Sequence, residues 1–152
     1  MKQRVTVLIV IVVAALLGTI SLASAQKAKV SAVVLYVQHQ SRTGAAWKQA
    51  KVGTVLPAGS RIRTQKRSKC EVKFPDGSYV RLGPRSQMLI RKPESRDMRL
   101  RYGSLFGHIV SGHGARIESG KAVAAIKGTE FLLRAGEDGG NPSLYIWSSA
   151  KG

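Results

Sequence analysis

The chain has 152 residues, which suggests one domain of ordinary size. Its 25 lysines and arginines outnumber 8 acidic residues, so the formal net charge is +17, and 43% of the residues are hydrophobic, enough for a core. A single cysteine excludes an internal disulfide, so stability must come from the packed core.

The first 25 residues have the pattern of a secretory signal peptide. A basic pair precedes an uncharged apolar stretch, and Ala23 and Ala25 form an A-x-A cleavage site. We therefore expect residues 1–25 to be a signal peptide cleaved after Ala25, and the protein to be exported to the periplasm or cell envelope. Cleavage would remove Lys2 and Arg4 and leave a net charge of +15. The alternative is an uncleaved segment that anchors the chain in the membrane.

Strand signals dominate the rest of the chain. Short apolar and β-branched segments recur about every ten residues, and turn-rich sequences such as AGS, PDG, GPRS and SGHG separate them. The predicted strands are VSAVVLYVQ (30–38), SRIRT (60–64), CEVKF (70–74), SYVRL (78–82), QMLIR (87–91), MRLRY (98–102), LFGHIV (105–110), ARIES (115–119), VAAIK (123–127), EFLLR (130–134) and SLYIW (143–147). No segment has an apolar period of 3.6 residues over helical length. We therefore predict an all-β domain over residues 26–152, a β-sandwich or jelly-roll-like roll of short antiparallel strands.

Cys70 lies in CEVKF, where it alternates with charged residues on the same side as Val72 and Phe74. This period of two predicts that Cys70 is buried in a strand. A reactive or intermolecular thiol is the alternative.

The segment FPDGSYVRL predicts a tight hairpin between two strands. Pro75 presets φ for the turn, Asp76 can accept a hydrogen bond from its own backbone, and Gly77 can take a positive φ. These roles involve no chemistry. Asp76 and Ser78 as a catalytic pair would need a base, and His108, the nearest histidine in sequence, is thirty residues away.

The sequence around this turn resembles the FecR domain, an exported β-domain. FPDGSYVRLGPRS matches the central motif, Trp47 with VGTVLPAGSRIRTQKRSKCEVKF matches the upstream pattern, and LRYGSLFGHI and AVAAIKGTEFLL match the downstream elements. Together these segments cover about residues 30 to 147, nearly the whole chain after the predicted signal peptide. The resemblance implies that the motif residues are structural: Pro75, Asp76, Gly77, Ser78, Gly128, Thr129 and Phe131.

The chain departs from the family pattern in two places. A family Gly-Asp pair is Gly59-Ser60 here, so any role of that acid is absent. The family continues beyond the Gly-Thr-Glu-Phe element into a further hairpin and strand, whereas this sequence ends at SSAKG. We therefore expect the last strand to be missing, which would leave an edge open for strand pairing with a partner.

In its best-known architecture the domain relays the state of an outer-membrane iron–siderophore receptor to a cytoplasmic sigma factor. Because only residues 1–4 precede the apolar run, we expect that this chain does not itself contact a sigma factor. Fold-level resemblance alone does not establish a function.

Catalytic and metal-binding patterns are weak. His39, His108 and His113 could form a metal site with Cys70, but no ligand spacing supports one, and surface or turn histidines are the favoured interpretation. Glu130 could be a general acid or base but lacks a partner carboxylate, so we favour an ion pair with an arginine. We expect no catalytic residue, no metal and no cofactor.

The positive charge is the remaining functional clue. Alternation in RIRT and MRLRY places Arg61, Arg63, Arg99 and Arg101 on the solvent side, and these four would line one anion-binding face if their strands are neighbours. The alternative is a dispersed, solvated charge. Few aromatic residues are expected on the polar faces, and export limits access to nucleic acid, so we disfavour that partner. Anionic cell-wall glycans, lipopolysaccharide phosphates or lipid headgroups suit the compartment better.

The sequence therefore predicts a non-enzymatic, exported binding or scaffold module of the cell envelope, acting through a protein or an anionic polymer. The alternative is an accessory component of transmembrane signalling linked to iron–siderophore uptake. Membrane contact is expected only through an uncleaved N-terminal segment.

Overall fold

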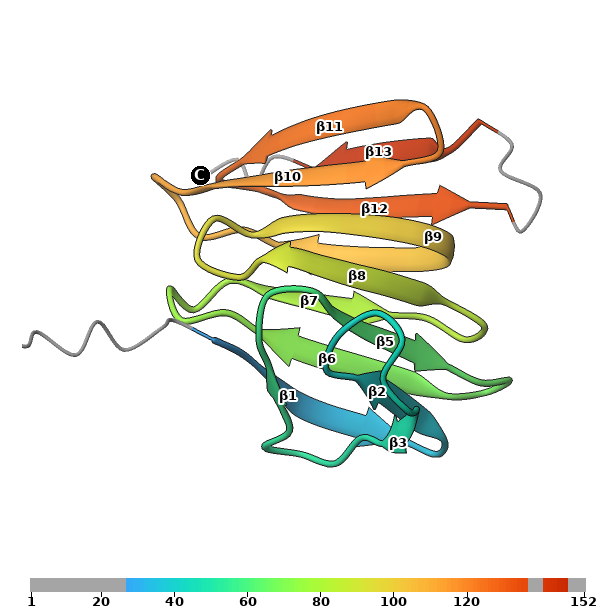
Figure 1. Cartoon of the computed structure of the whole chain (residues 1–152). Helices are drawn as coiled ribbons and strands as arrows, with labels where there is room; N and C mark the ends of the chain where they lie inside the picture. The colour runs from blue at the N-terminus through green and yellow to red at the C-terminus, as the bar shows by residue number, and fades with distance from the viewer. Residues whose placement is uncertain (1–26, 137–140, 148–152) are drawn as a thin grey trace, which may run out of the picture.

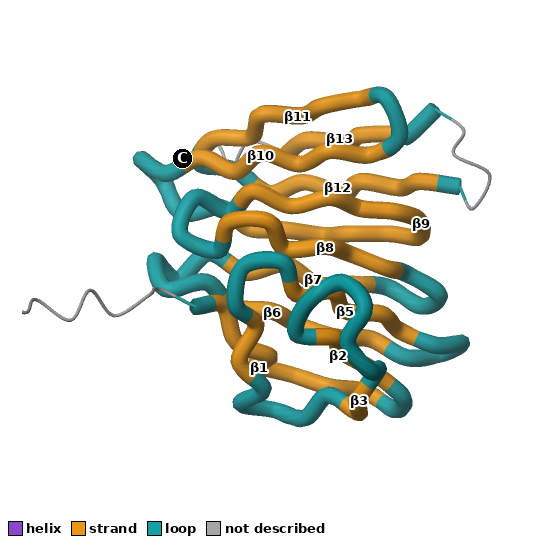
Figure 2. The backbone as a smooth tube through the Cα atoms, in the orientation of Figure 1, coloured by secondary structure: helices purple, strands orange, loops and turns teal. Residues whose placement is uncertain are grey.

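The computed structural model describes residues 27–136 and 141–147, and these consist of strands and loops (Figures 1 and 2). The all-β prediction is confirmed for this part of the chain. The predicted signal peptide, residues 1–25, lies outside the described residues. Among those described, no helix is long and apolar enough to cross a bilayer.

Two sheet layers share the long strand β9 (Asp97–His108). Sheet A has the order β4-β1-β6-β7-β9-β12-β13 and contains β1 (Ala28–Val34), β4 (Val55–Leu56), β6 (Lys69–Lys73), β7 (Tyr79–Leu82), β12 (Glu130–Ala135) and β13 (Ser143–Trp147). Sheet B has the order β3-β2-β5-β8-β9-β10-β11 and contains β2 (Val37–Gln40), β3 (Lys48–Gln49), β5 (Ser60–Thr64), β8 (Gln87–Lys92), β10 (Gly114–Ser119) and β11 (Ala122–Lys127). In Figure 1 the strands stack upward along the chain, from β1–β3 at the bottom to β11 and β13 at the top. The result is the predicted sandwich-like roll.

Strand β9 (Asp97–His108) connects the two layers. Its first half pairs with β8 in sheet B, and its second half pairs with β7 and β12 in sheet A. Gly103 lies where the partners change and has a φ of 93°, which glycine adopts without steric cost. The segments 98–102 and 105–110, predicted as two strands, are therefore largely one bent strand.

Two other features differ from the prediction. The single strand predicted over 30–38 is divided between β1 and β2 by Leu35, whose φ of 58° bends the chain from sheet A into sheet B. Strands β9 and β10 pair in parallel through Asp97–Arg99 and Arg116–Glu118, so the roll is not wholly antiparallel.

One hydrophobic core fills the space between the layers. Alternate residues of most strands are buried, and the core includes the fully buried Ile62, Val72, Leu100 and Phe131. Burial of each such side chain contributes about 1.5–3 kcal/mol to folding. Cys70 is 2% exposed and belongs to this core, as its alternation predicts.

Candidate functional site

The Asp76 turn is the tight hairpin that the sequence predicts. Strands β6 and β7 pair with Val72 opposite Val80, and the amide of Phe74 donates to the carbonyl of Ser78 at 2.8 Å. Gly77 has a φ of 90° and donates to the carbonyl of Phe74 at 3.1 Å. The turn residues therefore have the backbone roles that their types suggest.

The Asp76 side chain also connects three turns of the roll: its own β6–β7 turn, the β8–β9 turn that contains Arg96, and the β9–β10 turn that contains His113. Its Oδ2 accepts hydrogen bonds from Ser78 Oγ (2.8 Å) and from Arg96 Nη1 (2.9 Å), and it lies 2.8 Å from His113 Nδ1. Arg96 comes from the β8–β9 turn, where its Nε also donates to the Gly114 carbonyl at 2.7 Å. The side chains of Asp76 and Arg96 are only 10% and 14% exposed, so the pair is nearly buried.

Several effects act on the Asp76 carboxyl. Burial raises its pKa, but hydrogen bonds from Ser78, the positive charge of Arg96 and the hydrogen bond with His113 outweigh burial, so the pKa lies below its ordinary value. The carboxylate is therefore charged at neutral pH and holds its neighbours in place.

This cluster contains serine, aspartate and histidine but not in a catalytic arrangement. The Ser78 hydroxyl donates to Asp76 and accepts from the amide of Val110 at 3.1 Å, and Ser78 is fully buried. His113 contacts the carboxylate instead of the hydroxyl, so it is not placed to take the Ser78 proton. Sequence reasoning missed His113 and Arg96 because their contacts with Asp76 depend on the packing of distant turns.

The other candidate chemical residues are dispersed. His108 Nδ1 lies 3.6 Å from Glu130 Oε1, and the His108 ring stacks on Tyr79. The prediction that Glu130 pairs with an arginine is therefore wrong, because its partner is a histidine. Among the described residues no group of three or more His, Cys, Asp or Glu side chains is placed to hold a metal ion. Burial, assisted by the charge of Glu71, raises the pKa of the Cys70 thiol to about 12, which leaves it protonated and unreactive.

The four predicted arginines share one face but not one site. Arg61 and Arg63 on β5 point outward from sheet B, as do Arg99 and Arg101 on β9. Strand β8 lies between β5 and β9 and places Leu89 opposite both Arg61 and Arg99. The strands are therefore not neighbours, and no two of these arginines on β5 and β9 are directly opposed.

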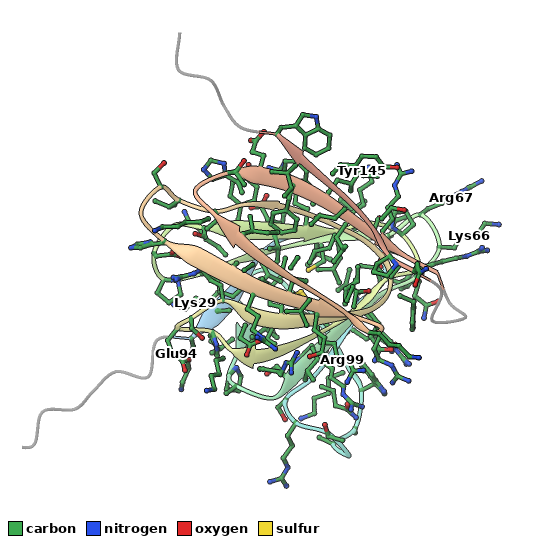
Figure 3. All side chains as sticks on the ribbon, turned by 90° about the horizontal axis from the view of Figure 1, so that it is seen from above. Lys29, Lys66, Arg67, Glu94, Arg99 and Tyr145 are labelled. Atoms are coloured by element: carbon green, nitrogen blue, oxygen red, sulfur yellow. The ribbon has the colours of Figure 1, made fainter. Side chains whose placement is uncertain are left out.

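The structure groups Arg63 and Arg101 with two further cations in an open groove of about 760 Å³, which we name the basic groove. The groove is lined by Arg63, Thr64, Gln65, Lys66, Arg85, Arg101 and Tyr102. Arg61 is not among the lining residues, and Arg99 lies instead 3.4 Å from Glu118. Figure 3 shows Lys66 on one side of the molecule, with Lys29 and Glu94 on the opposite side.

The basic groove has no acidic counterpart. The seven ion pairs among the described residues involve other cations, chiefly Arg81, Arg91, Arg96 and Arg99 with the two histidines. No acidic residue lines the groove, so four positive charges lie together without an ion-pair partner in the described part of the chain. Arginine presents a planar fork of donors that suits carboxylate and phosphate groups.

A β-bulge and a buried hydrogen-bond network position the groove. Tyr102 is paired with Gln87 and the next pair is Leu100 with Met88, so Arg101 is an extra residue in β9. The bulge allows Arg101 and Tyr102 to line the groove together, although adjacent strand residues normally point to opposite faces.

The turns that carry Lys66 and Arg85 are tied to each other. Thr64 Oγ1 donates to the Gly83 carbonyl at 2.6 Å and accepts from the Ser86 amide at 3.0 Å. The Arg85 amide donates to the Gln65 carbonyl at 3.2 Å. Groove cations therefore project from a backbone that is already ordered.

Two groove arginines are held in special ways. Arg63 stacks 4.0 Å above the Trp47 ring and its Nε donates to Gln38 Oε1 at 2.9 Å. Arg85 follows Pro84 in a turn and has a φ of 47°, a conformation that costs a non-glycine residue about 1–2 kcal/mol. Glycine would adopt this backbone conformation without strain, and the exposed Arg85 side chain makes no contact in the core that would explain the arginine. Strained residues of this kind are often found at functional sites, which is consistent with a role for Arg85 in binding.

Comparison with known proteins concerns the same part of the chain. The family described as FecR protein matches residues 60–145, more than half of the chain and all of the basic groove. The chain belongs to the FecR family. No curated protein and no solved structure matches it.

FecR proteins form a regulatory family associated with transmembrane signalling in iron–siderophore regulation, and they are membrane-associated or periplasmic. Three motif residues of this FecR chain lie in ordered turns or in the core. Gly128 has a φ of 60°, Thr129 accepts a 2.9 Å hydrogen bond from Ile109, and the Phe131 ring packs so closely on Gly107 that a Cβ there would lie 2.2 Å away.

Proposed function

We propose that this FecR-family protein is a non-enzymatic, exported module of the cell envelope that binds an anionic polymer through the basic groove. The observation that carries the proposal is the gathering of Arg63, Lys66, Arg85 and Arg101 around one groove without an acidic residue in its lining. The predicted Arg61 and Arg99 lie on the same sheet face and would add longer-range attraction.

The groove chemistry favours repeated carboxylate or phosphate groups. Two or more arginine forks can each bind one such group in a bidentate manner, and the open shape admits a chain that extends beyond the groove. Tyr102 offers a ring on which a sugar could rest. Anionic cell-wall glycans and the phosphates of lipopolysaccharide both have this chemistry, whereas nucleic acid would find only one aromatic residue in the groove.

Export supports access to such polymers. We propose that residues 1–25 are removed after Ala25 and that the protein resides in the periplasm or envelope, on the basis of the N-terminal sequence pattern. N-terminal sequencing of the protein from an envelope fraction should yield Gln26 as the first residue. Recovery of the intact N-terminus from the membrane would instead support the anchor alternative.

The binding proposal is tested by co-sedimentation of the purified protein with peptidoglycan and, separately, with lipopolysaccharide. Binding should weaken strongly between about 0.05 M and about 0.5 M salt, because the Debye length falls from more than 10 Å to about 4 Å. The two arms distinguish glycan from lipid phosphate as the source of the anions, and dextran serves as the uncharged control. Binding to dextran alone, or to neither anionic polymer, would refute the proposal.

A second candidate function is an accessory role in transmembrane signalling, and membership of the FecR family favours it. In this case a protein partner, not a polymer, would transmit the effect. Deletion of the protein should then change transcription of siderophore-receptor genes under iron limitation. Unchanged transcription in the deletion strain would count against this candidate.

A further inference from the structure

Strand β13 is an edge strand of sheet A that lacks the usual protection against pairing with another strand. It pairs with β12 on one side over five residues, and the described residues provide no strand on the other side. At the opposite end of the roll, the edge strands β3 and β4 have two residues each. The remaining edge strand, β11, has Lys121 before it and Lys127 at its end. Short strands and lysines are common protections against edge pairing, and β13 has neither.

The side chains of β13 are unusually exposed for an apolar strand. Leu144, Tyr145, Ile146 and Trp147 are 37%, 50%, 55% and 49% exposed. Leu144 and Ile146 are paired with the buried Leu133 and Phe131, so they lie on the core side of the sheet. Their exposure shows that the core is open at this end of the roll.

A small pocket adjoins this open end. Its volume is about 100 Å³, and Ile117, Ser119, Ala124 and Leu144 are among its lining residues. The Ser119 hydroxyl is buried there without a hydrogen-bond partner in the described part of the chain. An additional strand beside β13 would cover Leu144 and extend the core over this pocket.

We propose that the occupant of this edge is β13 of a second copy, paired antiparallel about a two-fold axis through Tyr145. This pairing would place Leu144 of each copy opposite Ile146 of the other and Ser143 opposite Trp147, which joins apolar residues on the core side. Such an interface is isologous, because the same surface is used twice. The pairing does not involve the basic groove and is independent of polymer binding.

Charge selects this occupant. Strand β13 carries no charged residue, so two copies can pair without opposing like charges. A partner strand with acidic side chains would find no cation on β13 to match it. The rest of the molecule is strongly basic, with a net charge of +17 for the whole sequence, so two copies repel at low salt.

The interface is small. A pairing of five residues a side buries less than the roughly 1,200 Å² of a standard stable interface, so the dimer should be weak, with a dissociation constant on the order of 10–1,000 μM. A high local concentration in the envelope would favour it.

Sedimentation velocity of the purified protein tests the proposal over a range of about 5 to 1,000 μM at about 0.05 M and about 0.5 M salt. The protein should dimerise reversibly, and salt should strengthen the dimer, whereas salt weakens binding to an anionic polymer. The opposite salt effects keep the two proposals separable. A monomer at every concentration in high salt overturns this one.

Two substitutions on exposed side chains locate the interface. Tyr145→Lys would place two lysines opposite each other at the two-fold axis and should raise the dissociation constant at least about tenfold. Tyr36→Lys makes the same substitution between β1 and β2, away from β13, where Tyr36 is 69% exposed, and should leave dimerisation unchanged. Equal dimerisation by the parent and Tyr145→Lys, or loss of the dimer in Tyr36→Lys, refutes the assignment.

If Tyr145→Lys fails to fold, hydrogen exchange on the unmodified protein tests instead whether β13 forms the dimer interface. The β13 amides should exchange more slowly as the concentration rises, while the β11 amides should not. Concentration-independent exchange throughout β13 overturns the proposal.

Discussion

Replacement of Asp76 by asparagine should destabilise the fold strongly, although the two side chains have nearly the same shape. In one orientation the asparagine NH2 would face the groups that now surround Oδ2 at 2.8–2.9 Å, from Ser78, Arg96 and His113. In the other it would face the Ser78 amide, which now donates to Oδ1 at 3.1 Å, and in both the negative charge beside Arg96 is lost. Breaking a buried ion pair costs about 3–5 kcal/mol, and the side chains here are only 10–14% exposed. We expect a loss of about 3 kcal/mol, or roughly 10 °C in melting temperature.

Glu71→Gln is the matched control. It makes the same change of charge and shape in the strand that leads to the Asp76 turn, but the partner of Glu71 is Arg81, which is 55% exposed. An exposed pair contributes about 0–1 kcal/mol, and the glutamine can still accept the hydrogen bond from Ser31. Urea unfolding followed by circular dichroism measures both variants. Equal losses would refute the conclusion that Asp76 joins the three turns.

The same reasoning gives a pH dependence. Because the folded pKa of Asp76 lies below its ordinary value, its contribution to stability is complete above the unfolded pKa of about 3.9 and is lost as pH falls through the folded pKa. The stability difference between the parent and Asp76→Asn should therefore shrink as pH is lowered below about 4. A difference that stays constant down to about pH 2 would contradict the assigned pKa shift.

Three further predictions concern backbone and thiol. Gly77→Val should cost about 1–3 kcal/mol because Gly77 has a φ of 90°, and an unchanged melting temperature would contradict the turn. Gly103→Ala should cost more than Gly112→Ala in urea unfolding: both have positive φ, but only at Gly103 would a Cβ meet Ser86, whose Oγ would lie 2.2 Å away. Cys70 should resist Ellman's reagent at about pH 8 until the protein is unfolded, and a fast reaction of the native protein would contradict its burial.

The sequence predicts those features of the fold that depend on local patterns. Alternation of apolar and polar residues predicted strands such as β5 and β6, and the types of Pro75, Asp76 and Gly77 predicted the hairpin between β6 and β7. Both signals arise from neighbouring residues and from the side-chain period of two. These features can therefore be predicted without knowledge of the tertiary fold.

Features that depend on distant contacts were not predictable. The continuation of β9 through Gly103 depends on four partner strands, and the division at Leu35 depends on the separation of the two sheets. The basic groove required the β-bulge at Arg101 and the approach of two turns, so Arg85 was not associated with Arg63 beforehand.

A milder variant separates binding from folding. Arg85→Gly removes one groove cation and relieves the positive φ, so the fold should be about as stable as the parent. Polymer binding should nevertheless weaken, because one of four cations is lost. Binding equal to that of the parent would show that Arg85 does not contact the polymer.

The central claim is that the basic groove binds an anionic envelope polymer, and charge reversal on opposite sides of the molecule tests it most directly. Arg63→Glu with Arg101→Glu changes two groove cations, whereas Lys29→Glu with Lys73→Glu changes two cations that face each other on β1 and β6 and lie outside the groove. Both double variants change the net charge equally. The measurement is the affinity of each folded variant for immobilised lipopolysaccharide and peptidoglycan at about 0.15 M salt. The groove variant should lose affinity by at least about tenfold while the control stays within a few-fold of the parent. Equal losses in the two variants, or a larger loss in the lysine variant, would contradict the claim.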